Sequence, residues 1–331
     1  MTTDKVLDED RFARIALIGL GLIGSSIGHA VRRAGRAGET SLAGHIVGHA
    51  RSQATMDKAL EIGFVDSVEA DPVAAVRDAD LVILSIPVGA FGAMAALIGP
   101  HLKPGAILSD VGSVKEAVVR DMSPHLAEGV HLIPGHPVAG TEFSGPESGF
   151  AELFDGRWCI LTPPPGADPL ATEKVTRFWQ ACGSRVEIMT PKHHDLVLAI
   201  TSHVPHLIAY NIVGTAADLE TVTESEVIKY SAGGFRDFTR IASSDPVMWR
   251  DIFLNNREAV IETLGRFVED LTALQRAIRW GEGDQLEALF TRTRAVRRNI
   301  VDAGQETAAP DFGRSHGGDG DDGDSDSDSD A

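Results

Sequence analysis

The sequence predicts an α/β fold in which a doubly wound parallel sheet is followed by an all-α helical domain. Short apolar segments of strand length alternate with helical segments over the first part of the chain. From Pro191 onward, segments with helical periodicity follow one another and no strand is apparent. The predicted organisation is an N-terminal extension at 1–13, a sheet domain at 14–190, a helical domain at 191–305 and a disordered acidic tail at 306–331.

The expected strands are short apolar runs, as in a sheet that is covered on both faces. The first, at 14–18, leads into a helix at 25–33. A helix beginning near Asp168-Pro169 has a good N-terminal signal and lies between the last two strands. The sheet is expected to end after them, and the later strands are predicted at 45–48, 81–86, 106–110, 131–134, 158–162 and 185–189.

The second domain is predicted to be helical, with helices at about 192–218, 223–232, 246–280 and 282–303. One apolar stripe follows the third of these helices at spacings of three and four residues. Such a stripe either packs inside its own chain or contacts a second subunit, and we expect a contribution to a homodimer. The stripe consists of Leu264, Phe267, Leu271, Leu274 and Ile278.

Composition excludes several classes of protein. The net charge is −18, which disfavours nucleic acid as a partner, because phosphate binding needs clustered Lys and Arg. Of this charge, −7 lies in the tail from Asp311, which has eight Asp and one Arg. Apolar runs such as 81–86 are much shorter than the ~20 residues of a membrane span. The acidic start of the chain does not resemble a signal peptide, which favours the cytoplasm. With only Cys159 and Cys182, neither a disulfide framework nor a zinc cluster is supported, and no metal site is predicted.

A glycine-rich run, Gly-Leu-Gly-Leu-Ile-Gly, joins the first strand to the first helix. Gly19 permits the tight turn, Gly21 lets a pyrophosphate approach the backbone, and Gly24 lets the helix pack closely on the strand. The helix N-terminus then offers free amides and the positive end of its dipole. This context predicts a Rossmann-type dinucleotide-binding domain. The expected cofactor contacts are Gly19, Gly21, Leu22, Ile23, Gly24, Ser85, Pro87 and Ser113.

The end of the second strand bears on the choice of cofactor. An Asp or Glu here normally binds the ribose 2′-hydroxyl of NAD, but the chain reads His49-Ala50-Arg51-Ser52. Arg51 and Ser52 offer a guanidinium and a hydroxyl where a 2′-phosphate needs them. NADP is therefore favoured and NAD remains possible, since Arg51 can also stack on the adenine or point to solvent.

Two predicted loops at strand ends are rich in reactive groups, and ligands of open parallel sheets bind beyond the carboxyl ends of the strands. One loop runs over 110–115 and contains Ser113, and the other runs over 135–142 and contains His136. An imidazole with an ordinary pKa of ~6.5 can take a proton from a substrate hydroxyl while hydride departs to a nicotinamide. Taken alone, a His beside Pro is more often structural, but the neighbouring polar groups favour a catalytic role.

The helical half adds a second polar set at 202–206 and 233–240. Arg240 can clamp a carboxylate with a bidentate fork, and Asp237, three positions earlier, can hold that fork on the same helical face. The alternative is a surface ion pair of little energetic value.

Taken together and in order, the motifs GLGLIG, DVGSVK, GHPVAGTE, SHVPH and GGFRDFTRIASSDPVMWRD closely resemble the prephenate and arogenate dehydrogenases of tyrosine biosynthesis, over about residues 14–305. The resemblance implies that His136 accepts the substrate hydroxyl proton and that Ser113 orients it and the nicotinamide. It implies that Arg240 binds a substrate carboxylate, supported by Asp237. The other pocket residues that it implies are Thr141, Glu142, Ser202, His203, His206, Arg236 and Trp249.

The resemblance also implies the reaction. Prephenate would lose hydride from C4 to the cofactor and its hydroxyl proton to His136, and CO2 would leave as the ring becomes aromatic, which gives 4-hydroxyphenylpyruvate. Prephenate is favoured, with arogenate as a possible second substrate whose ammonium group Glu142 can pair. Relatives that use NAD often carry Asp where this chain has Ala50. The second His of SHVPH, His206, is linked in the family to inhibition by tyrosine.

Two other functions remain open at this point. A β-hydroxyacid dehydrogenase also joins a Rossmann-type domain to a helical one, but it needs a Lys in the helical domain, for which Lys192 and Lys229 are the candidates. A non-catalytic NADP-binding sensor would keep the glycine loop and lose the His, Ser and Arg set, which this chain retains.

Overall fold

The computed structural model describes residues 11–36, 41–141, 143–218 and 233–302. It divides after Thr272, within helix α12 (Arg257–Trp280), into two compact units. The first unit contains both sheets and most of the helices, and the second contains the end of α12 and helix α13 (Gly283–Asp302). The predicted helix at 223–232 and the acidic tail lie outside the described residues, as does most of the N-terminal extension.

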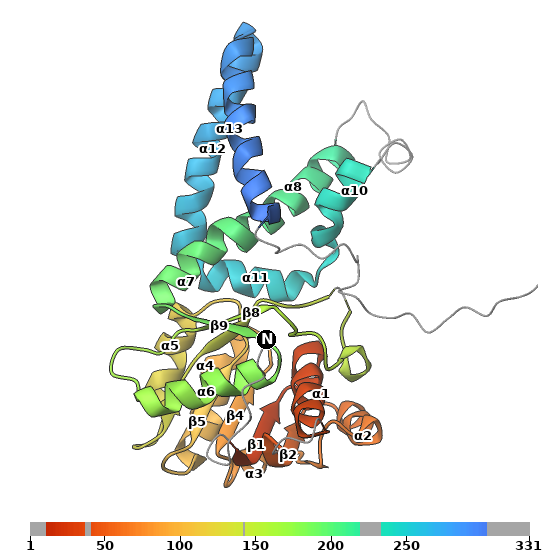
Figure 1. Ribbon diagram of the computed structural model, residues 1–331, viewed down its shortest axis with the longest axis vertical. Coiled ribbons are helices and arrows are strands. Elements are labelled where there is room, and N and C mark those ends of the chain that lie inside the picture. The colour runs from red at the N-terminus through yellow and green to blue at the C-terminus, as the bar shows by residue number, and fades with distance from the viewer. Residues whose placement is uncertain (1–10, 37–40, 142, 219–232, 303–331) are drawn as a thin grey trace, which may run out of the picture. The chain divides into compact units, whose positions relative to one another are not determined.

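The main sheet confirms the predicted doubly wound, parallel arrangement (Figure 1). Its six strands follow the order β3-β2-β1-β4-β5-β6, and all paired neighbours are parallel. Ile18 is aligned with His49 on one side and with Leu84 on the other, so three strands end at the same edge. The strands are β1 (Phe12–Ile18), β2 (Ala43–His49), β3 (Ser67–Val68), β4 (Leu81–Leu84), β5 (Ile107–Asp110) and β6 (His131–Leu132).

Helices cover both faces of this sheet, which explains why its strands are continuously apolar. Successive residues of β1 enter different cores, because side chains alternate along a strand. Leu17 belongs to one cluster with Trp179, and Ile18 belongs to another with Phe91. The helices of this part are α1 (Leu22–Arg36), α2 (Gln53–Ile62), α3 (Pro72–Val76), α4 (Phe91–Ile98), α5 (Glu116–Met122) and α6 (Pro169–Ala181).

The last strands form a separate sheet, and this differs from the expectation of one sheet. Strands β7 (Gly135–Pro137), β8 (Trp158–Leu161) and β9 (Arg185–Ile188) pair in the order β7-β8-β9. β7 runs antiparallel to β8, so the chain changes sheets between Leu132 and Gly135. Pro134 lacks an N–H for a ladder, and its carbonyl instead accepts the N–H of Thr162. The segment predicted as a loop around His136 is therefore strand β7.

The helical part begins with α7 (Pro191–Leu198), a π-helical turn (Ala199–His203) and α8 (Val204–Asp218). Together they confirm the predicted helix at 192–218. Helix α10 (Gly233–Thr239) and a 3-10 turn (Arg240–Ser243) follow after the segment that is not described. The predicted helix at 246–280 is in fact two helices, α11 (Pro246–Asn255) and α12, separated at Asn256, whose φ of −112° and ψ of 34° are not helical.

The stretch Pro191–Asp218 is long and apolar enough to cross a membrane by length and composition. The expectation of no membrane span rested on shorter apolar runs. This stretch, however, carries the buried side chains of His194, Asp195 and His203, and the first two are hydrogen-bonded to residues of the sheet domain. We interpret it as a core helix of a folded domain, because ionisable groups are costly in a bilayer.

Candidate active site

The glycine loop has the shape of a dinucleotide cradle. Gly19 has a φ of +103°, and a Cβ there would overlap the carbonyl of Ser85, as a Cβ on Gly24 would overlap the carbonyl of Gly19. A Cβ on Gly21 would meet no atom within 4 Å, so this glycine faces open space. The Ser85 hydroxyl is buried without a hydrogen-bond partner among the described residues. A tight turn, an open backbone and an unused donor are what a bound pyrophosphate and nicotinamide require.

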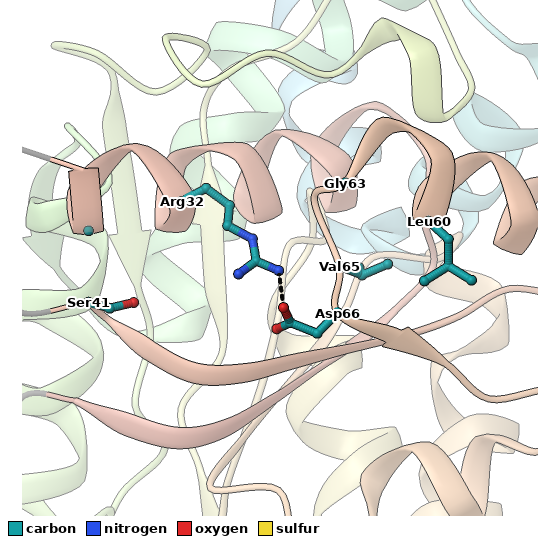
Figure 2. A pocket seen from close by; sticks show the side chains of 7 residues that line it. Arg32, Ser41, Leu60, Gly63, Val65 and Asp66 are labelled. Carbon is teal, nitrogen blue, oxygen red and sulfur yellow. Dashed lines mark hydrogen bonds and ion pairs between the residues drawn. The ribbon is translucent and has the colours of Figure 1, made fainter.

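A hollow of the same domain lies away from the glycine loop. It measures about 590 Å³ and contains the ion pair between Arg32 and Asp66, whose atoms are 2.6 Å apart (Figure 2). Arg32 is near the end of α1, and Ser41 and Asp66 precede β2 and β3. This hollow therefore lies at the amino ends of the strands, whereas ligands of such sheets bind at the carboxyl ends. None of the predicted site residues lines it.

Arg51 and Ser52 lie between β2 and α2, and both are exposed. Ser52 is the N-cap residue of α2, yet its hydroxyl makes no capping hydrogen bond. The hydroxyl and the guanidinium are thus both available to a ligand at the end of β2. Ala50 places no carboxylate there.

A buried ion pair connects the Ser113 loop to strand β7. Lys115 Nζ lies 2.5 Å from Asp110 Oδ2 and donates a second hydrogen bond to the carbonyl of Gly135 at 2.6 Å. Asp110 also accepts the N–H groups of Gly112 and Gly135. Both side chains of the pair are fully buried, and burial raises the pKa of Asp110 and lowers the pKa of Lys115. The pair holds the end of β5 beside the residue that precedes His136.

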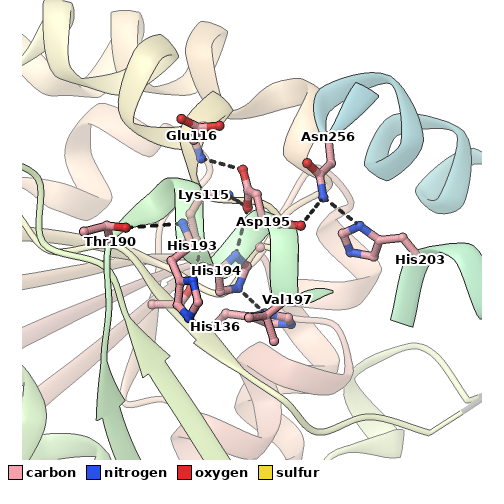
Figure 3. A network of polar contacts seen from close by, with 12 residues as sticks. Lys115, Glu116, His136, Thr190, His193, His194, Asp195, Val197, His203 and Asn256 are labelled. Atoms are coloured by element: carbon pink, nitrogen blue, oxygen red, sulfur yellow. Dashed lines mark hydrogen bonds and ion pairs between the residues drawn. The ribbon is translucent and has the colours of Figure 1, made fainter. Parts of the chain in front are cut away.

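His136 is the first member of a chain of buried polar groups (Figure 3). Its Nδ1 lies 2.8 Å from Nε2 of His194, and Nδ1 of His194 lies 2.8 Å from Oδ1 of Asp195. Asp195 also accepts the N–H groups of Lys115 and Glu116, at 2.7 and 2.9 Å. The relative exposures of His136, His194 and Asp195 are 7%, 0% and 1%. Helix α7 thus reaches from the helical part to the back of the predicted base.

Burial keeps these imidazoles neutral. It lowers the pKa of His136 well below 6.5, with smaller contributions from His194 and Lys115. It lowers the pKa of His194 to about 2, helped by Lys115. Burial raises the pKa of Asp195, although the N–H groups of Glu116 and Lys115 oppose this change. A neutral imidazole is the form that can accept a proton.

The π-helical turn places Ser202 and His203 beside this network. Asn256, at the break between α11 and α12, donates to the carbonyl of Asp195 at 2.8 Å and lies 3.0 Å from His203 Nδ1. Burial lowers the pKa of His203 to about 4, and the backbone of Ser113 acts in the opposite direction, so His203 lies close to the Ser113 loop. Single π turns inside α-helices are frequent at functional sites.

An aromatic wall continues from His203. The rings of His206 and Trp249 stack at 3.7 Å with an interplanar angle of 24°, and Nδ1 of His206 donates to the carbonyl of Ser202 at 2.8 Å. The indole N–H of Trp249 is buried without a hydrogen-bond partner among the described residues. Burial lowers the pKa of His206, and the nearby charge of Arg240 adds to this effect. Arg240 therefore lies on the same side of the helical part as this wall.

The remaining predicted residues are more exposed. Asp237 lies 3.5 Å from the adjacent Arg236, with side-chain exposures of 75% and 76%, and the expected Asp237–Arg240 pair is not among the ion pairs of the described residues. Ion pairs between side chains this exposed contribute little to stability. Thr141 lies in the loop after β7, and its hydroxyl accepts the N–H of Phe143 at 3.3 Å. Glu142 lies outside the described residues.

Sequence reasoning missed His194, Asp195 and Asn256 and gave Asp110 and Lys115 no role. A signal for the first two was present, because Thr190-Pro191 begins a helix and His193-His194-Asp195 follows in its first turn.

Of the two lysines that were candidates for the base of a β-hydroxyacid dehydrogenase, Lys192 is exposed and Lys229 lies outside the described residues. No cluster of three or more His, Cys, Asp or Glu suited to a metal occurs in the described part of the chain.

Comparisons with known proteins agree with this geometry. Residues 27–188 match the family model of the prephenate dehydrogenase nucleotide-binding domain, and residues 190–292 match that of the prephenate dehydrogenase dimerization domain. The chain is 41% identical to the cyclohexadienyl dehydrogenase of Zymomonas mobilis, over 86% of this chain and 95% of that protein. It is 31% identical to the prephenate dehydrogenase of Bacillus subtilis, over 90% and 78%.

A solved structure extends the similarity to three dimensions. The Aquifex aeolicus prephenate dehydrogenase, in complex with hydroxyphenyl propionate and NAD+, superposes with a TM-score of 0.79 at 34% identity, covering 87% of this chain and 98% of that one. Synechocystis arogenate dehydrogenase gives a TM-score of 0.73 at 27% identity over 87% and 99%. The chain belongs to the prephenate dehydrogenase family.

Proposed function

We propose that the protein catalyses the oxidative decarboxylation of prephenate to 4-hydroxyphenylpyruvate, with a nicotinamide dinucleotide as the oxidant. The observation that carries this proposal is His136, a buried neutral imidazole held on β7 beside the Ser113 loop. It belongs to the same domain as the glycine cradle, and the adjacent β5 ends at the edge where dinucleotides bind. A proton acceptor and a hydride acceptor are thus brought to one substrate.

In the proposed reaction, the C4 hydroxyl of prephenate gives its proton to His136 while hydride leaves C4. When bound, the nicotinamide accepts that hydride. The ring carboxylate then departs as CO2, the electrons of that C–C bond complete the aromatic ring, and the C4 oxygen takes the proton back from His136 to give the phenol. The chain's own task is to orient the hydroxyl and hold the proton, and Ser113 is proposed to orient His136 and the nicotinamide.

The carboxylates of prephenate are proposed to bind on the helical side of the site. Arg240 supplies a fork for one of them, and its proximity to His206 supports this role. Trp249 offers an unused buried donor and a flat surface for a ring. Arg236 and Asp237 are proposed to border the entrance. The remaining proposed contacts are Thr141, Glu142, Ser202, His203 and His206, and Glu142 would also pair with the ammonium group of arogenate.

NADP is proposed as the preferred dinucleotide. The support comes from the exposed Arg51 guanidinium and the free hydroxyl of Ser52, in a position where no carboxylate would repel a 2′-phosphate. The Aquifex complex contains NAD+, and this describes the cofactor of that protein. Arg51→Ala removes one charge-assisted contact, which is worth about 1.5–3 kcal/mol.

A steady-state matrix of prephenate and arogenate against NAD and NADP tests the proposal. We expect the highest kcat/KM for prephenate with NADP, and in Arg51→Ala a KM for NADP raised about tenfold or more with the KM for NAD nearly unchanged. Arg77→Ala serves as the control, because Arg77 is another exposed arginine of the same domain. Equal losses for both dinucleotides in Arg51→Ala would contradict the NADP preference, and no turnover of either substrate would contradict the function.

We further propose that residues 14–190 bind the dinucleotide, that residues 191–305 bind substrate and dimerise, and that the enzyme acts in the cytoplasm. The match to a dimerization domain supports a homodimer. The predicted apolar stripe supports it too, because Leu271 and Ile278 are 51% and 67% exposed in the single chain. Apolar side chains so exposed along one helix are typical of a subunit contact.

A further inference from the structure

Two residues behind the proposed base have no role in the reaction as stated so far. His194 and Asp195 lie on α7, and their side chains form a linear series with His136 (Figure 3). All three are almost completely buried, and every polar contact in the series is between 2.7 and 2.9 Å. Both nitrogens of the buried His194 therefore have a partner, and the identity of each partner fixes which nitrogen carries the proton.

The series fixes the positions of two protons. Both oxygens of Asp195 accept backbone N–H groups, from Lys115 and Glu116, as an ionised carboxylate does. The carboxylate therefore also accepts the hydrogen bond from His194, whose Nδ1 carries the proton. A neutral His194 then has a bare Nε2, which can only accept. The donor in the bond between the two imidazoles is therefore Nδ1–H of His136.

This assignment leaves the other nitrogen of His136 free. A neutral His136 protonated at Nδ1 has its lone pair on Nε2, the nitrogen that does not contact His194. That nitrogen can take the hydroxyl proton of the substrate without first losing one. Neutral imidazole in water prefers the opposite tautomer, with the proton on Nε2, which would be unable to act as a base at that atom.

We propose that His194 and Asp195 are positioning residues that hold the proton of His136 on Nδ1 and thereby keep its Nε2 ready to accept the substrate proton. During the reaction the O–H bond of the substrate breaks, its proton moves to Nε2 of His136, and the resulting imidazolium keeps its Nδ1–H bond to His194. Asp195 supplies the negative charge at the far end of the series. Lys115, His203 and Asn256 surround the series, and Lys115 and Asn256 contact Asp195 through hydrogen bonds. The inference rests on the proposed role of His136 as base.

The tautomer can be measured directly by 15N NMR of the full chain labelled at its 12 histidines. His136→Asn assigns the signals of His136 by their loss. We expect the wild-type protein to show the Nδ1–H form of His136, and His194→Leu to move it toward the Nε2–H form. The Nε2–H form in the wild-type protein would overturn the proposal, whether or not His194→Leu folds.

Kinetics supply the second test. In His194→Leu we expect kcat for prephenate to fall about 10²-fold, within the range for loss of general base function, while KM and cofactor affinity change less than about threefold. His194→Gln should recover most of this loss, because its amide oxygen can accept from His136. His193→Leu is the matched control, since His193 is the exposed neighbour on the same helix.

Two kinetic results would overturn the proposal, namely an unchanged kcat in His194→Leu or an equal loss in His193→Leu. The NMR measurement needs no substrate, so failure of the proposed function is seen separately, as turnover that survives in His136→Asn. A structural role for His194 alone would change the unfolding midpoint without changing the tautomer of His136 in the folded protein.

Discussion

The two sides of the proposed substrate site lie in opposite environments. On the base side, His136 is 7% exposed and is connected through His194 to a fully bonded carboxylate. On the anion-binding side, Arg236 and Asp237 have side chains about three-quarters exposed, and Arg240 is also exposed. One side is fixed before substrate arrives, whereas the other is still in contact with water.

This difference has a physical basis. A general base contributes only if its lone pair is already aimed, so its orienting groups must be buried and fully hydrogen-bonded. Burial of an arginine without its anion would leave a desolvated charge, which is costly. The arginines therefore remain hydrated until a carboxylate provides the partner. Changes on the base side should affect kcat and folding, and changes on the arginine side should affect KM.

The largest effect is expected at His136. His136→Asn removes the proton acceptor and keeps a small polar side chain, so kcat for prephenate should fall by about 10²- to 10⁴-fold. The dissociation constant of the cofactor, measured by fluorescence titration, should remain unchanged because the glycine cradle is intact. Turnover within a few-fold of the wild-type value would exclude His136 as the base.

The buried ion pair offers the next largest effect, on folding. Lys115→Met leaves Asp110 as an uncompensated buried charge, which should lower the free energy of unfolding by about 3–5 kcal/mol. Urea denaturation measures this change. Lys103→Met is the control, because the pair between Lys103 and Asp80 is partly exposed and is worth at most about 1 kcal/mol. Equal losses in the two variants would mean that burial of the Lys115 pair has no special consequence.

On the exposed side, Arg240→Ala should raise the KM for prephenate about 10- to 100-fold through loss of a charge-assisted hydrogen bond. The KM for the cofactor should not change. Arg250→Ala provides a comparison, since Arg250 is exposed and paired with the adjacent Asp251. An unchanged KM for prephenate in Arg240→Ala would remove this arginine from the site.

Much of the nucleotide-binding half could be predicted because its signals are local. A few consecutive residues are enough to identify the glycine spacing after β1, and the same holds for the apolar strands β4 and β5. Strand β7 was not predicted because it has only three residues, including a Gly and a Pro, and it exists through pairing with β8 more than twenty residues later. Such long-range pairing leaves no periodic pattern in the short strand.

The network behind His136 was missed for a similar reason. His194 is 58 residues from His136 in the chain, and only the packing of α7 against the sheet domain, where it contacts α5, brings their rings together. Asn256 ends α11, and the only local signal for the break between α11 and α12 was the Asn255-Asn256 pair. The buried state of Lys115 was equally hidden, since lysine is almost always exposed.

The most direct test of the central claim is a single-turnover experiment with the wild-type enzyme, prephenate and NADP, in which all products are counted. The account predicts one NADPH, one CO2 and one 4-hydroxyphenylpyruvate for each prephenate consumed. Reduction of the cofactor without release of CO2, or consumption of prephenate without reduction of the cofactor, would contradict it.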